Sequence, residues 1–177
     1  MKKVLSIEPF STTYYDDLER HGDYGVQDVD GWKTFPDGTK GNITKLGCKI
    51  NGEEPKGVYT MFSFLEAMNP TYKGDRQFGF SFASFLTCSC GHGGCAGYHD
   101  NVVIRRKKNT VMVVGKKEDG YNEGVVLTGE SVVYFDKEQW DGVLDHYLKL
   151  FKENPDGVFE DTGFMFTGRW GTKNFSK

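Results

Sequence analysis

One stretch of the chain carries a strong local folding signal, an amphipathic helix with a defined start. Asp136 and Gln139 have the spacing of a capping box, and Phe135 and Trp140 flank the cap as a hydrophobic staple. Asn154-Pro155 then ends the pattern. These signals predict a helix over residues 136–153, cap included, that packs on a sheet through one face. The apolar residues of that face recur at helical spacing: Trp140, Val143, Leu144, Tyr147, Leu148 and Phe151.

The middle of the chain carries strand signals. Phe78, Phe80 and Phe82 alternate with small residues, which is the pattern of a half-buried strand. Two apolar runs, 102–104 and 111–114, flank a polar segment and predict a hairpin. Asn51-Gly52 predicts a tight turn after another strand, at residues 42–50.

Together these patterns predict an α+β fold in a single domain, residues 1–177. We expect a mostly antiparallel sheet with one long C-terminal amphipathic helix packed on a face. Residues 1–41 are rich in Tyr, Asp and Gly without a sustained period, and they predict a loop-rich N-terminal segment. Residues 78–115 predict a sheet with a Cys/Gly-rich hairpin.

Charge and composition restrict the class of protein. The formal net charge is −3, which argues against a general nucleic-acid binder. Residues 37–117 nevertheless carry 12 basic and 6 acidic residues, so the middle of the chain is net +6. Either this part faces phosphates, or the acidic ends neutralise it at the surface. No apolar run is long enough for a membrane span, and no export signal is evident, so we expect a cytoplasmic protein without a membrane partner.

The densest chemistry lies in a segment that holds three of the four cysteines. Cys88, Cys90 and Cys95, with His92 or His99 as fourth ligand, match the ligands that zinc prefers. In a reducing compartment clustered thiols favour a metal over disulfides, and intervening glycines let the backbone wrap around it. The alternative is that these thiols pack as small core residues at a strand end. A third interpretation is a Cys/His-dependent hydrolase or transferase.

The same segment resembles a group of bacterial and phage proteins that share the motif C-x-C-G-x-x-G-C. Here the motif reads Cys88-x-Cys90-Gly91-x-x-Gly94-Cys95, and the resemblance covers roughly residues 84–150. It implies that the motif is one structural unit, and its phage members suggest a phage or mobile-element protein that binds a host protein. The group has no assigned activity, so the resemblance implies no reaction.

A second candidate site is the run of cations Arg105, Arg106, Lys107 and Lys108. On a hairpin tip these side chains would reach phosphates, or they would keep a strand edge soluble. Since no catalytic motif is recognised, the leading hypothesis is a non-enzymatic binding protein with a structural zinc-held hairpin and a protein partner. The alternatives are the Cys/His enzyme and a nucleic-acid binder that uses residues 105–108.

Overall fold

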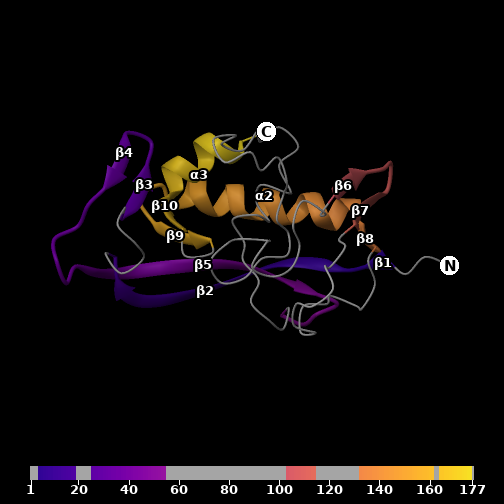
Figure 1. Cartoon of the computed structure of the whole chain (residues 1–177), viewed down its shortest axis with the longest axis horizontal. Helices are drawn as coiled ribbons and strands as arrows, with labels where there is room; N and C mark the ends of the chain where they lie inside the picture. The colour runs from indigo at the N-terminus through magenta and orange to yellow at the C-terminus, as the bar shows by residue number, and fades with distance from the viewer. Residues whose placement is uncertain (1–3, 19–24, 55–102, 115–131, 162–163, 177) are drawn as a thin grey trace, which may run out of the picture.

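The computed structural model describes residues 4–18, 25–54, 103–114, 132–161 and 164–176 (Figure 1). These residues form two β-sheets and two helices, and the helices pack against the sheets. The strands are β1 (Val4–Leu5), β2 (Ile7–Asp17), β3 (Val26–Asp28), β4 (Gly31–Lys33), β5 (Lys40–Ile50), β6 (Val103–Arg106), β7 (Thr110–Val114), β8 (Val132–Asp136), β9 (Val158–Asp161) and β10 (Phe164–Thr167). The helices are α2 (Lys137–Glu153) and α3 (Gly168–Phe175).

The four-stranded sheet has the order β1-β8-β7-β6, and the six-stranded sheet has the order β2-β5-β9-β10-β3-β4. The long antiparallel pair of β2 and β5 runs along the molecule, and α2 packs on β2 in roughly the same lengthwise direction in this view (Figure 1). The β6–β7 and β3–β4 hairpins lie at opposite ends of the long axis (Figure 1). Any surface on one hairpin is therefore remote from a surface on the other.

The described residues combine helices and strands as the α+β prediction expects, but the predicted arrangement is wrong in two respects. The described strands form two sheets rather than one; five of their eight pairings are antiparallel, as expected, and three are parallel: β1–β8, β5–β9 and β10–β3. The last helix is α3, which has only eight residues, so the long helix is neither alone nor the C-terminal one. Parallel pairing joins segments far apart in the chain, and no local pattern indicates such a connection.

The long helix itself is confirmed, with its cap. The Asp136 carboxylate accepts a hydrogen bond from the Gln139 N–H at 2.9 Å, and all six predicted stripe residues are buried. The rings of Phe135 and Trp140 lie 5.2 Å apart, which completes the staple. The Gln139 side chain, however, accepts from the Ile7 N–H instead of turning back to the cap, so it joins α2 to β2.

Two predicted turns are also confirmed. Asn51 and Gly52 both have positive φ angles, 53° and 79°, directly after β5. Strands β6 and β7 pair antiparallel around residues 107–109, as the apolar runs predicted. In both places a short local pattern determines the structure.

The prediction of a loop-rich N-terminal segment is wrong for its described part. It contains the eleven-residue strand β2 and the short strands β3 and β4. The antiparallel pair of β2 and β5 packs on different cores at its two ends. The Ile7 and Ile50 pair lies in the core under α2, whereas Ile43 lies in the second core with Val26 and Met165. Because the buried face changes along each strand, neither shows a regular alternation.

The C-terminal aromatic residues divide between a strand and a helix. Strand β10 ends at Thr167, whose hydroxyl accepts from the Trp170 N–H at 3.2 Å and caps α3. Trp170 therefore lies in a helix. Gly168 and Gly171 weaken the helical pattern, which hides this short element in the sequence.

Candidate functional site

The predicted metal ligands are not part of the described structure. Cys88, Cys90, His92, Cys95 and His99 all fall between residues 55 and 102. The strand predicted from Phe78, Phe80 and Phe82 falls there too. Within the described ranges, no three His, Cys, Asp or Glu side chains converge as a metal site would require. The zinc site remains a prediction from the sequence.

The remaining cysteine, Cys48, is buried on β5. Burial, with a further contribution from the charge of Asp161, raises its pKa to about 12. The thiol therefore stays protonated at neutral pH. A nucleophilic cysteine needs the opposite shift, so Cys48 has no place in an enzymatic hypothesis.

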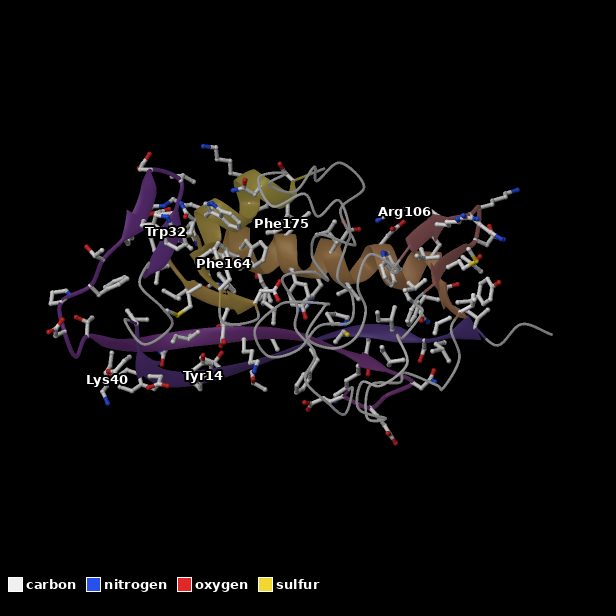
Figure 2. The ribbon with its side chains drawn as sticks, viewed as in Figure 1. Tyr14, Trp32, Lys40, Arg106, Phe164 and Phe175 are labelled. Carbon is white, nitrogen blue, oxygen red and sulfur yellow. The ribbon has the colours of Figure 1, made fainter. Side chains whose placement is uncertain are left out.

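The predicted cationic run forms the end of β6 and the turn that follows it. Arg105, Lys107 and Lys108 are exposed, whereas Arg106 is partly buried (Figure 2). Burial lowers the pKa of Arg106, and the nearby charge of Asp141 on α2 partly offsets this. Arg106 is therefore set apart from the other three cations, which face solvent. We call Arg105, Lys107 and Lys108 the cationic tip.

The cationic tip is held in place by backbone hydrogen bonds. The Lys107 N–H donates to the Thr110 carbonyl at 2.8 Å, which closes the turn. The Lys137 N–H, at the start of α2, donates to the Asn109 carbonyl at 3.1 Å. The turn is therefore joined to the helix, so its three cations sit on a defined scaffold.

At the opposite end of the molecule a buried carboxylate holds four segments together. Asp28 is only 4% exposed. It pairs with Lys33 of β4 at 2.8 Å and with Arg169 of α3 at 2.9 Å, and it accepts from the Thr167 hydroxyl at 2.7 Å. Burial alone would raise the pKa of Asp28, but hydrogen bonds from these residues and from the Val29 N–H outweigh it and hold the pKa well below its usual range.

Since both Asp28 oxygens are occupied, this carboxylate is structural. Separating Asp28 from Lys33 and Arg169 would leave a buried carboxylate charge without its partners. These contacts therefore join the β3–β4 hairpin to α3. Arg169 extends the connection to Asp156 at 3.2 Å. We call Asp28 with its partners Lys33, Thr167 and Arg169 the Asp28 anchor.

Next to the Asp28 anchor lies a group of aromatic rings that the sequence did not reveal. Trp32 of β4 is 45% exposed, and its ring meets Phe164 edge-on with centroids 5.9 Å apart (Figure 2). Phe164, partly buried, in turn contacts Trp170 of α3 at 5.3 Å. We call Trp32, Phe164 and Trp170 the aromatic patch. Its members come from three elements, and only the β10–β3–β4 pairing brings Trp32 to the others.

Comparisons of the chain with protein-family models, with curated proteins and with solved structures find no match. The resemblance to bacterial and phage proteins therefore stays a prediction. None of the described helices is long and apolar enough to cross a membrane.

Proposed function

We propose that this chain is a binding protein that recognises a protein partner through the aromatic patch. The observation that carries the proposal is the state of Trp32, which exposes nearly half of its surface while its ring rests on Phe164. Large exposed aromatic residues are frequent anchors of protein interfaces. An exposed aromatic side chain whose neighbours already hold it in place loses little conformational freedom on binding.

The Asp28 anchor supports this proposal because it fixes the strand that carries Trp32. Lys33, the next residue along β4, is paired with the buried Asp28 carboxylate. Thr167 and Arg169 bring the start of α3, and with it Trp170, to the same carboxylate. The patch is therefore built on a rigid base.

Replacing Trp32 with alanine tests the patch. We expect Trp32→Ala to weaken the partner complex about 30-fold, the loss typical of an interface hot spot, with little change in folding stability because the ring is half exposed. The partner would first be captured from the native cell with the wild-type chain. Its dissociation constant would then be measured against each variant.

Tyr15→Ala is the matched control. Tyr15 is 67% exposed on β2, outside the aromatic patch, so its loss should leave the affinity unchanged. Equal affinities of the wild-type chain and Trp32→Ala would refute the proposal.

We also propose that Cys88, Cys90 and Cys95 bind one structural zinc ion with His92 or His99. The support is their spacing among glycines. Native mass spectrometry should find zinc in the wild-type chain and in Cys48→Ala, and should find less in Cys90→Ser. A zinc-free wild-type chain would instead favour packed thiols, and a reactive Cys95 would favour the enzymatic alternative. The host partner and the cytoplasmic location stay predictions.

A further inference from the structure

The cationic tip has no part in the proposed protein interface, because it lies at the opposite end of the molecule (Figure 1). Within the described part of the chain, no ion pair joins Arg105, Lys107 or Lys108 to an acidic residue. Lys33, Lys40, Lys137, Lys149 and Arg169 each have an acidic partner. The exposed Lys45, Lys152 and Lys173 have none among the described residues, but they lie on three different elements, β5, α2 and α3. The cationic tip differs because it gathers three such cations within residues 105–108, without the local neutralisation expected of an ordinary charged surface.

Arg106 shows the contrast within the same run. It is the one member of the four that is partly buried, and the nearest acidic influence on it is Asp141 of α2. Asp141 is also the partner of Lys137. Asp141 thus acts on Arg106 and Lys137, and no ion pair among the described residues engages Arg105, Lys107 or Lys108.

We propose that the cationic tip binds the phosphodiester backbone of a nucleic acid, without reading its sequence. The segment from Arg105 to Asn109 contains no apolar side chain. Protein interfaces need an apolar or aromatic centre and are poor in lysine, whereas arginine and lysine make most contacts to phosphates. The braced turn presents its charges without needing to fold on binding.

The number of cations sets the expected salt dependence of the affinity. Three phosphate contacts give a slope of log affinity against log salt of about −2 for a single strand and about −2.7 for a duplex. Sequence-independent binding of this kind has dissociation constants of about 10⁻⁴–10⁻⁶ M at physiological salt. Binding should therefore be measurable at low salt and fall steeply as salt is added.

The test is a salt titration of the full-length chain with fluorescent single-stranded and duplex oligonucleotides of mixed sequence. The triple variant Arg105→Gln, Lys107→Gln, Lys108→Gln should lose most of the affinity and nearly all of the slope. The matched control, Lys45→Gln, Lys152→Gln, Lys173→Gln, removes three exposed charges from β5, α2 and α3 and should keep both. Thermal unfolding of both variants should match the wild-type chain, since none of the six side chains is buried.

Three results would overturn the proposal. The first is no binding by the wild-type chain at low salt, which leaves the tip as a solubilising edge. The second is an equal loss in the control, which shows diffuse attraction rather than a site. The third is equal binding of polyglutamate, which points to an acidic protein. Binding of either oligonucleotide with the expected slope supports the proposal. The lower dissociation constant at the same salt concentration identifies the preferred form. Neither result depends on Trp32, so the proposed protein interface stands or falls separately.

Discussion

Gly168→Ala should lower the free energy of unfolding by about 3 kcal/mol, the upper part of the usual range for an overpacked core. Gly168 opens α3, where that helix crosses the end of α2. A methyl group there would overlap the Asn154 carbonyl oxygen and lie 2.7 Å from the Phe151 carbonyl oxygen. Both obstacles are backbone atoms and cannot rotate away. The helices would have to separate, which would loosen the packing around Phe151 and Phe166.

Gly142→Ala is the matched control, and it should have the opposite sign. Gly142 lies in the middle of α2, and a methyl group there meets nothing within 4 Å. Alanine should therefore stabilise the helix by about 0.5–1 kcal/mol. Urea unfolding of both variants measures the difference. If both changed stability equally, helix propensity alone would explain Gly168, and the close approach of α2 and α3 would be wrong.

Tyr147→Phe should cost about 1–3 kcal/mol, since it removes the oxygen that hydrogen-bonds to partly buried backbone groups of two strands. The side chain of Tyr147 is fully buried. Its hydroxyl reaches Phe10 and Gly47, which face each other in the paired strands β2 and β5. It donates toward the Phe10 carbonyl at 2.9 Å and the Gly47 carbonyl, and it accepts from both N–H groups at 3.2 Å. This one oxygen connects α2 to both long strands.

Tyr15→Phe serves as the control, because the same atom is removed from an exposed ring. Its unfolding free energy should stay within about 0.5 kcal/mol of wild type. Hydrogen exchange adds a local readout: in Tyr147→Phe the amides of Phe10 and Gly47 should exchange faster than in the wild-type chain. Unchanged exchange at both amides would show that the hydroxyl does not hold this pair.

Elements defined by neighbouring residues were predictable. The α2 helix was predicted because its cap, staple and stripe all lie within about five turns of chain. The β6–β7 hairpin followed from two apolar runs around a polar turn, and the cationic tip followed with it. Asn51-Gly52 marked its turn for the same reason. In each case the favourable interactions form between residues close in sequence, so the pattern itself contains the information.

What only the tertiary structure decided depends on contacts between distant segments. The side chains of β2 and β5 pack on two cores, so the strands lack the alternation that would reveal them. Asp28 has the appearance of a loop acid until β3 pairs with β10 and brings it to Thr167 and Arg169. Trp32 becomes part of an aromatic patch only because the fold places its ring against Phe164. The sequence by itself determined α2 and the cationic tip, because contacts between neighbouring residues stabilise them. The Asp28 anchor and the aromatic patch were decided by the tertiary structure, because burial and charge pairing across the sheet outweigh local preference.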